Sequence, residues 1–384
     1  MTQTGTKKSL IDHFSALEDP RQAWKVEYPL PEIMLLVLCA TLAGAETFVE
    51  TALWGRKKLA FLRGLLPFKR GIPSHDALND VVNALDAELF CECFSAWVES
   101  LRESVPDIVA IKPAPAKAGG KTSRRAHARD GHALHTVSAW ASRQRLVLGQ
   151  QAAAEKSNEI TAIPLLLERL QLAGALVTID AMGCQSAIAE AVVAKGADYL
   201  LALKGNQLSL SGEVELFFAD PSRCSEPYQT VEADHGRIET RRHFVSHDVD
   251  WFVTGRRFPG EPRFPGLKAI AMVEAVIEAK ATGAVTTARR YFISSMALDA
   301  PFFAKAARAH WGIENRLHWV LDVVFHDDLM RLRTENGPKN MATVKHMALN
   351  LVKSAPGKES LRAKRKAAGW DDAFLLAIIR NHGQ

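Results

Sequence analysis

No stretch of this sequence is both apolar and long enough to span a lipid bilayer. The longest uncharged apolar stretch runs from Ile33 to Ala45, a length that is typical of a buried helix. The start of the sequence also lacks the layout of a secretory signal peptide. These absences argue against a membrane protein, and we expect a cytoplasmic one.

Cysteine is scarce, and its pattern excludes two classes of small-domain scaffold. The chain has five cysteines, an odd number, which does not support a disulfide framework. Cys91 and Cys93 are too close together for the usual zinc-ligand spacing. The sequence has no internal repeat and no low-complexity tract. A cytoplasmic protein with free thiols fits these observations. The five cysteines are Cys39, Cys91, Cys93, Cys184 and Cys224.

The composition allows a large folded protein with a mild preference for nucleic acid. With 384 residues, 47% of them hydrophobic, the chain can form two or three domains with sizeable cores. The formal net charge of +5 is only a weak signal, but basic residues gather in two clusters, each of which fits either solvated surface or phosphate contact. The first cluster is Lys121, Arg124, Arg125, His127 and Arg129, and the second is Arg362, Lys364, Arg365 and Lys366.

Residues 1–105 have the pattern of a helical N-terminal domain. Apolar periodicity broken by Gly and Pro predicts helices over Pro31 to Ala45, Thr47 to Leu65 and Asp76 to Ser104. Ser74 or Asp76 is expected to cap the third of these helices.

The pattern changes after residue 105 to that of an α/β core, predicted over residues 106–350. Apolar runs predict three strands, and the segment that follows alternates helices and strands, which indicates a mixed sheet with flanking helices. Residues 207–290 are predicted to be a β-rich insertion, and a basic helical tail is predicted over 351–384. The first three strands are predicted over Ile108 to Ile111, His135 to Ala141 and Leu146 to Gln150, and a long helix over about Pro301 to Leu332.

Asp180 is the first candidate for chemistry, because it ends the otherwise apolar strand in "LVTIDAMG". In open α/β sheets the ligand crevice lies outside the carboxyl ends of the strands. A purely structural alternative is that Asp180 caps the turn or helix that follows it.

A second candidate group lies on the predicted long helix, where four polar residues recur every four positions. Such a stripe on a helix with apolar flanks is either hydrogen-bonded inside the protein or binds a ligand. Zinc is disfavoured because the two histidines lie eight residues apart without a His-Glu-x-x-His motif. An acid at a sheet edge, an acid on a late helix and a basic cluster together suggest metal-dependent phosphoryl transfer on nucleic acid. The stripe is His310, Glu314, His318 and Asp322.

Several long motifs then resemble a known family. "KSNEI", "VTIDAMGCQ", "GADYLLALKGNQ" and "HWGIENRLHWVLDVVFHDD" are similar to the transposases of bacterial insertion sequences of the ISAs type, which include the H-repeat-associated proteins. "LEDPR", "LAGAE", "WG" and "GIPSHD" resemble the domain associated with that family. The resemblance covers about residues 10 to 350, with the motifs in the same order.

The resemblance implies a ribonuclease H-like core with an Asp-Asp-Glu (DDE) triad that binds two Mg²⁺ ions, with Mn²⁺ as an alternative ion. Asp180 matches the second acid of the triad and Glu314 the third, so both are expected to be catalytic metal ligands. The family cuts double-stranded DNA at the terminal inverted repeats of its element and joins the ends to target DNA, which implies a homodimer on DNA. The residues expected to contact DNA are Lys121, Arg124, Arg125, Lys204, Asn206, His310, Trp311, Asn315 and His318.

The chain departs from the family where the first acid is expected. In the family the first core strand ends in a pattern like Ile-Asp-Gly-Lys-Thr, whereas here the eight residues from Lys112 to Gly119 stand in place of one Asp, and none of them is acidic. Asp107 has the wrong strand parity to substitute, and Asp130 would need the following segment to fold back. We therefore expect a transposase with impaired catalysis. The alternative is a non-catalytic DNA-binding remnant, and a generic nuclease is a third possibility.

A second departure surrounds Glu314. Related transposases often place Tyr and Arg seven and four residues before the triad Glu, and Lys seven residues after it. Here those positions hold Ala307, His310 and Leu321.

Overall fold

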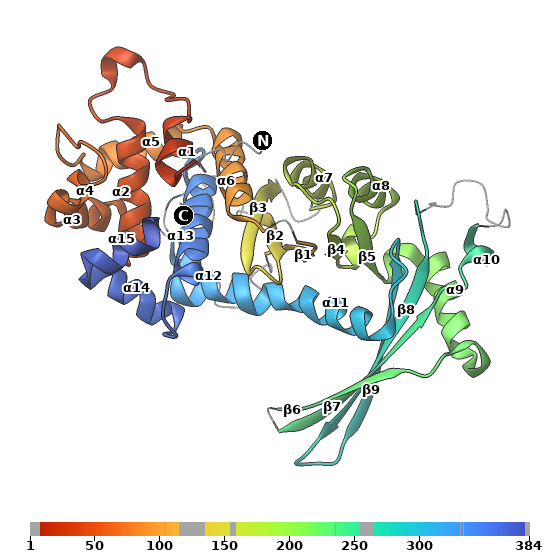
Figure 1. The fold of residues 1–384 in the computed structure, drawn as a ribbon. Helices are drawn as coiled ribbons and strands as arrows, with labels where there is room; N and C mark the ends of the chain where they lie inside the picture. Colours follow the sequence, from red (N-terminus) through yellow and green to blue (C-terminus); the bar gives the residue numbers. More distant parts are fainter. Residues whose placement is uncertain are drawn as a thin grey trace, which may run out of the picture.

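The structure, a computed structural model, describes residues 8–103, 105–114, 135–153, 159–234, 236–253, 264–330, 332 and 334–380. It confirms the predicted mixed α/β class. Helices from both ends of the chain form one body, and a nine-stranded sheet extends away from it (Figure 1). In the described residues, no helix is long and apolar enough to cross a membrane.

The N-terminal part of the helical body follows the predicted helical pattern. Its apolar centre is α2, whose side chains are almost all buried. The Ser74 hydroxyl accepts a hydrogen bond from the Ala77 N–H at 3.1 Å, so Ser74 is the cap of α5. The elements are α1 (Leu10–Ser15), the 3₁₀ turn η1 (Ala23–Lys25), α2 (Leu30–Leu42), α3 (Phe48–Lys57), α4 (Leu59–Arg63), α5 (His75–Ala84) and α6 (Ala87–Leu101).

Two of the predicted helices are each broken in the structure. The helix predicted from Thr47 to Leu65 is interrupted at Lys58, whose φ of −107° and ψ of 19° leave the helical region. The helix predicted from Asp76 to Ser104 stops before Leu85, and Asp86 starts a new helix by accepting hydrogen bonds from the Glu88 and Leu89 N–H groups, both at 2.9 Å. Apolar periodicity continues through both breaks, so it could not reveal them.

The C-terminal helices return to this body. They are α13 (Gly337–Ser354), α14 (Leu361–Trp370) and α15 (Asp372–Arg380), and Lys58 forms an ion pair with Asp372 at 2.6 Å. Two members of the second basic cluster are buried: Lys364 donates to the Ala355 carbonyl at 2.5 Å, and Arg365 donates to the Thr41 carbonyl at 2.7 Å. The sequence predicted that this cluster is either solvated surface or a phosphate contact. Both predictions are wrong for Lys364 and Arg365.

The sheet has the strand order β3-β2-β1-β4-β5-β9-β8-β7-β6. β1, β4 and β5 are parallel to one another, so their carboxyl ends lie at one edge. All the other neighbouring pairs are antiparallel. The strands are β1 (Ile108–Pro113), β2 (His135–Ala141), β3 (Leu146–Ala153), β4 (Leu176–Ile179), β5 (Asp198–Leu203), β6 (Tyr228–Asp234), β7 (Arg237–Ser246), β8 (Ala269–Ala279) and β9 (Val285–Ser294).

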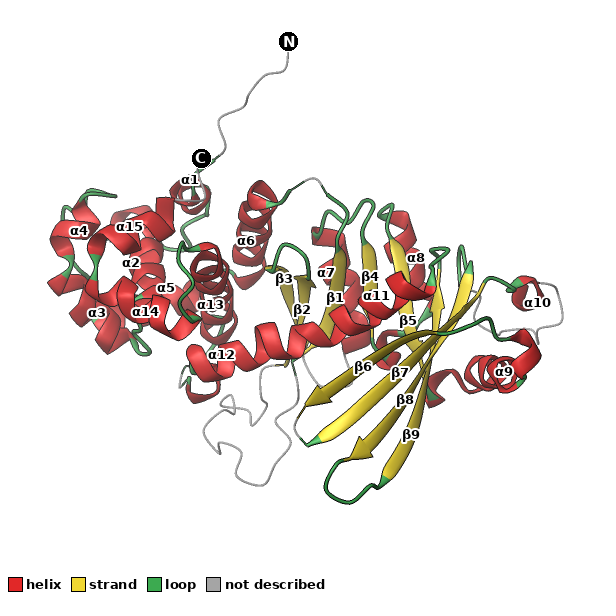
Figure 2. Ribbon diagram, turned by 60° about the horizontal axis from the view of Figure 1, so that its bottom comes forward, coloured by secondary structure: helices red, strands yellow, loops and turns green. Residues whose placement is uncertain are grey.

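Helices cover both faces of the parallel part of the sheet. α7 and α8 pack on one face, and α11 crosses the other against β1 and β4 (Figure 2). In residues 207–290, β9 pairs with β5, so the strands continue the core sheet. The remaining elements here are α7 (Glu159–Arg169), η3 (Ala181–Gly183), α8 (Ser186–Ala194), η4 (Gly205–Gln207), α9 (Leu208–Ala219), η5 (Pro221–Arg223) and α10 (Asp250–Val253).

The long helix predicted to end near Leu332 is shorter and is not uniform. It consists of α11 (Ala300–Ile313), one π turn (Glu314–His318) and α12 (Trp319–Val324), followed by the 3₁₀ turn η7 (Asp327–Leu329). It ends at Val324, because His326 takes a left-handed conformation with φ of 48°. The guanidinium of Arg365 donates to the Val324 carbonyl and so satisfies this helix end.

Asn350 joins the helical body to the sheet. Its side-chain amide accepts from the Val147 N–H and donates to the Val147 carbonyl, both at 2.9 Å, and Asn350 is fully buried.

We expect Asn350→Ala to lower the free energy of unfolding by about 2–4 kcal/mol, because both backbone groups of Val147 lose a buried partner. Urea denaturation measures this change. The exposed Asn315→Ala is the control, with an expected change below about 0.5 kcal/mol; equal effects of the two variants would contradict the assignment.

Candidate functional site

Asp180 lies at the carboxyl end of β4, where the sheet edge opens. All four residues of β4 are buried, and Asp180 then begins the turn η3, in which the Gly183 N–H donates to the Asp180 carbonyl at 3.1 Å. Gly183 is needed there, because an added Cβ would lie 2.3 Å from a methyl carbon of Ile179. The backbone N–H groups of Met182 and Gly183 in η3 lie close enough to the Asp180 carboxylate to lower its pKa, so the alternative that Asp180 caps this turn stays open.

Lys112 occupies the matching position on the neighbouring strand. Ile111 pairs with Ile179 in the parallel ladder, so the next residues along each strand, Lys112 and Asp180, lie side by side. Lys112 is 8% exposed, and its ammonium forms an ion pair with Glu314. The same ammonium lies 4.1 Å from the centre of the Trp311 ring. Lys112 thus lies beside Asp180 and forms an ion pair with Glu314, the two acids expected from the sequence.

Glu314 reaches this edge because α11 packs across β1 and β4 with one buried face. His310, one turn earlier, is held at the sheet by a 3.0 Å hydrogen bond between its Nδ1 and the hydroxyl of Thr178 on β4. Glu314 itself begins the π turn, in which the Trp319 N–H donates to the Glu314 carbonyl. The helix therefore brings Glu314 over the carboxyl ends of β1 and β4.

Two histidines of the predicted polar stripe are buried and neutral. Burial, followed by the nearby Lys112 charge, lowers the pKa of His310 to about 4, and the same two causes lower the pKa of His318 to about 4. Only 8% of His310 and 5% of His318 are exposed. In this structure neither imidazole presents a surface on which a DNA phosphate could rest.

The Asp180 carboxyl has an altered acidity. Burial raises its pKa, whereas the Lys112 ammonium and, after it, the backbone N–H groups of Gly183 and Met182 lower it; the Glu314 charge adds to the rise. Lys112 is therefore the nearby positive charge that favours the ionised form of Asp180. In a metal enzyme the bound cations would have this effect.

The comparisons with known proteins identify the family of the chain. Residues 106–351 match the family described as Transposase DDE domain, and residues 11–98 match the one described as DDE_Tnp_1-associated. YhhI of Escherichia coli strain K12, provisionally named an H repeat-associated transposase, is 38% identical over 98% of this chain and 99% of its own length. YncI of Escherichia coli O157:H7, provisionally named a transposase, is 38% identical over 97% of this chain and 94% of its own.

A solved structure of the piggyBac transposase synaptic complex with hairpin DNA is 10% identical, covering 99% of this chain and 83% of that chain with a TM-score of 0.44. The matched domain and the full-length relatives show that the chain belongs to the DDE transposases, of the type that includes the H-repeat-associated proteins. The mixed sheet and its flanking helices fit the expected ribonuclease H-like core.

DDE domains generally use divalent metal ions, but the residues that the structure describes at this sheet edge do not fit such a site. In the described residues no group of three or more His, Cys, Asp or Glu side chains could hold a metal ion. The Glu314 carboxylate is already paired with the Lys112 ammonium. A lysine at this position supplies a positive charge where a metal would need a negative ligand.

The residues predicted to contact DNA are only partly brought together. Trp311 and Asn315 are exposed on the helix that carries Glu314, and Lys204 is exposed just after β5. The side chain of Asn206 is outside the described part, as are Lys121, Arg124 and Arg125. These contacts stay predictions.

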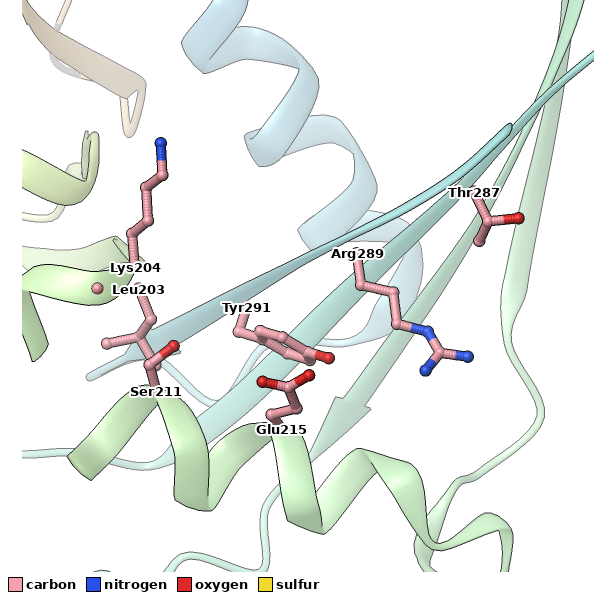
Figure 3. Close-up of a pocket in the computed structure, with 8 residues that line it drawn as sticks. Leu203, Lys204, Ser211, Glu215, Thr287, Arg289 and Tyr291 are labelled. Carbon is pink, nitrogen blue, oxygen red and sulfur yellow. The ribbon is translucent and has the colours of Figure 1, made fainter. Parts of the chain in front are cut away.

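Lys204 borders a polar pocket between β5, α9 and β9 (Figure 3). The pocket has a volume of about 550 Å³, and its lining includes Lys204, Glu215, Arg289 and Tyr291. Arg289 is paired with Glu274 at 2.9 Å. Its residues Leu203 and Lys204 lie at the carboxyl end of β5, the strand that pairs with β4.

Asp107, one of the two weighed substitutes for the missing acid, has a structural role. It is buried at the start of β1, and its carboxylate accepts hydrogen bonds from the N–H groups of Ile108, Arg143 and Gln144 at 2.7, 2.8 and 3.1 Å. It therefore stabilises the turn between β2 and β3, at the opposite end of β1 from Lys112. Asp130, the other substitute, lies outside the described residues.

Two residues of the site were not found from the sequence. Arg290 on β9 lies 4.9 Å from the centre of the Trp311 ring, and Trp319 is 57% exposed at the start of α12. No local motif marks Arg290, because its position depends on how β9 packs beside α11. The repeat of Trp at positions 311 and 319 was a visible signal, but only the structure shows that both rings are exposed.

The buried histidines predict a loss of stability in mild acid. Burial also lowers the pKa of His346 to about 3. Because the native imidazoles stay neutral while the unfolded ones bind protons below about pH 6.5, the unfolded state is favoured as pH falls from 6.5 towards 4. Each such group contributes up to about 1.4 kcal/mol per pH unit in this window.

Urea unfolding at pH 7.5 and pH 5 measures the effect. The wild type is expected to be less stable at pH 5, and His346→Gln is expected to reduce the difference between the two pH values. The control is His75→Gln, at a histidine whose side chain is 54% exposed, which should leave the difference unchanged. Equal wild-type stability at both pH values would show that these histidines are not buried in neutral form.

Proposed function

We propose that this chain binds the terminal inverted repeats of its insertion sequence but does not cut DNA as it stands. The observation that carries the proposal is the ion pair between Lys112 and Glu314 at the carboxyl ends of β1 and β4. Lys112 stands at the strand end where the family has its first acid, so the ion pair takes the place of the first metal ligand. Asp180 and Glu314 are then the remaining two members of the triad.

Support for DNA binding comes from the family and from the surface around the acids. Family members act on DNA ends, and the YhhI relative matches this chain over nearly its whole length. Lys204 and Trp311 are exposed near the Asp180 edge, and Arg290 lies against the Trp311 ring. Cations of this kind hold the phosphate backbone, and exposed aromatic rings contact bases. Since two element ends must be paired, we propose that the DNA-bound form is a homodimer.

Support for lost cleavage comes from charge. Two divalent ions about 4 Å apart need several carboxylate oxygens to hold them beside the phosphate. Lys112 supplies an ammonium in place of one carboxylate and occupies an oxygen of another. The described residues at this edge therefore support binding of DNA, and they do not support metal-dependent phosphoryl transfer.

The test compares three proteins on DNA that carries the repeats flanking the chain's own coding sequence. One is the wild type, the second has Lys112 to Gly119 replaced by a single Asp, and the third adds Glu314→Gln to the second. With Mg²⁺, only the second protein is expected to cut, because it alone has all three carboxylates. Gel analysis of end-labelled DNA measures cleavage, and fluorescence anisotropy on the same DNA should show binding by all three.

The controls separate the parts of this proposal. Omitting Mg²⁺ must abolish cutting by the second protein. If the wild type cuts as well as the second protein, the role given to Lys112 is wrong, and Asp130 becomes the next acid to replace. If none of the three proteins prefers the repeats over unrelated DNA, the proposed recognition of element ends is wrong.

A further inference from the structure

The outward face of the helix that carries Glu314 is unusual for a solvent-exposed surface. Its exposed side chains recur at helical spacing and include two tryptophans, Trp311 at 40% exposure and Trp319 at 57%. The opposite face packs on the sheet through buried residues such as Phe303 and Ile313. We call the exposed surface the tryptophan face, and define it as Arg308, Trp311, Asn315, Arg316 and Trp319.

The π turn aligns the two tryptophans. Eight residues of regular α-helix rotate by about 800°, which would leave the two side chains about 80° apart around the axis. A π turn takes up one extra residue, so the rotation corresponds to about seven α-helical residues and brings the rings within about 20° of each other. The two rings then follow one line along the helix, separated by roughly 11 Å, or about three nucleotide steps of a DNA strand.

A specific contact supports the π turn. Lys353 on α13 donates a hydrogen bond of 2.7 Å to the carbonyl of Arg316, inside the turn, and its ammonium lies 3.7 Å from the centre of the Trp140 ring. The turn is therefore built into the packing between the core and α13. π turns of this kind are frequent at functional sites.

The two rings differ in their surroundings. Trp311 is held beside the site by two cations, Lys112 at 4.1 Å and Arg290 at 4.9 Å from its ring centre. In the part of the chain that the structure describes, no ring or cation lies against Trp319. Arg308 is paired with Glu232 at 2.6 Å, whereas no carboxylate among the described residues pairs with Arg316. Among the described residues, the face thus offers an uncovered aromatic ring and, three positions earlier in the chain, a cation that no carboxylate pairs with.

We infer that the tryptophan face is a stacking surface for unpaired bases of a DNA strand, with Trp319 as the principal platform. The inference rests on the proposed function, because it assumes that DNA binds beside Asp180 and Glu314. Aromatic rings next to cations bind single-stranded DNA in this way, since every base has a π face and every nucleotide has a phosphate. A fully paired duplex would leave Trp319 without a stacking partner, so the face fits a DNA end with unpaired bases.

The experiment measures binding to four DNA probes by fluorescence anisotropy at one fixed salt concentration. All four carry the element's terminal repeat. One is blunt, two have a short unpaired 3′ or 5′ overhang, and one has an overhang of abasic sites that keeps the phosphates but lacks the bases. Wild type is expected to bind an overhang with bases about tenfold more tightly than the abasic overhang.

Trp319→Ala should abolish that preference and change blunt-duplex affinity by less than about twofold, and Trp319→Phe should keep part of the preference, because a phenyl ring still stacks. The matched control is Trp370→Ala, which removes a tryptophan that is 77% exposed on α14 in the helical body and should behave as wild type. Equal wild-type affinity for the base-containing and abasic overhangs would overturn the stacking inference alone. The inference would also be overturned if Trp370→Ala reduced the preference for bases as much as Trp319→Ala does. If the wild type bound none of the four probes, the proposed function would be overturned as well.

Discussion

The ion pair between Lys112 and Glu314 connects the end of the first core strand to the helix that crosses the sheet. Around it lie the Trp311 ring, the neighbouring acid Asp180 and the neutral imidazole of His310. Three carboxylates at this edge would carry a charge of about −3 and attract two divalent ions. With Asp180, Glu314 and Lys112 the net charge is about −1. The positive charge here belongs to a side chain of the protein and not to a bound ion. The same geometry that would assemble a metal site here assembles an internal ion pair.

Under the proposed function, the lysine at position 112 separates two activities of the family, DNA binding and DNA cleavage. The fold positions Asp180 and Glu314 through buried packing of β4 and α11. The DNA contacts that we propose depend on exposed side chains such as Lys204, Trp311 and Trp319. We propose that this chain keeps its fold and its DNA surface without the ligand set for cleavage. The tryptophan face and its π turn belong to the part that is retained.

Much of this arrangement was predictable from sequence, and the exceptions have physical causes. Apolar patterning predicted the strands and the position of Asp180 at a strand end, because burial dictates which residues a core strand can contain. It could not predict the helix breaks at Lys58 and Leu85, since apolar residues continue through them. Spacing by four placed the histidines and Glu314 on one stripe and left open whether they are hydrogen-bonded inside the protein or bind a ligand; packing on the sheet buries His310 and His318. The pairing of Lys112 with Glu314 joins residues 202 positions apart, so no local pattern contains it.

Metal binding to the purified chain tests the account most directly, because it examines the site without requiring DNA or turnover. Thermal unfolding would be followed with and without Mn²⁺ for the wild type and for the variant in which Lys112 to Gly119 is replaced by a single Asp. The account predicts no Mn²⁺-dependent rise in Tm for the wild type and a clear rise for the variant, since only a native state with the full ligand set binds the ion. An equal Mn²⁺-dependent rise in both proteins, abolished in each by Glu314→Gln, would contradict it, because the wild-type carboxylates would then hold a metal despite Lys112.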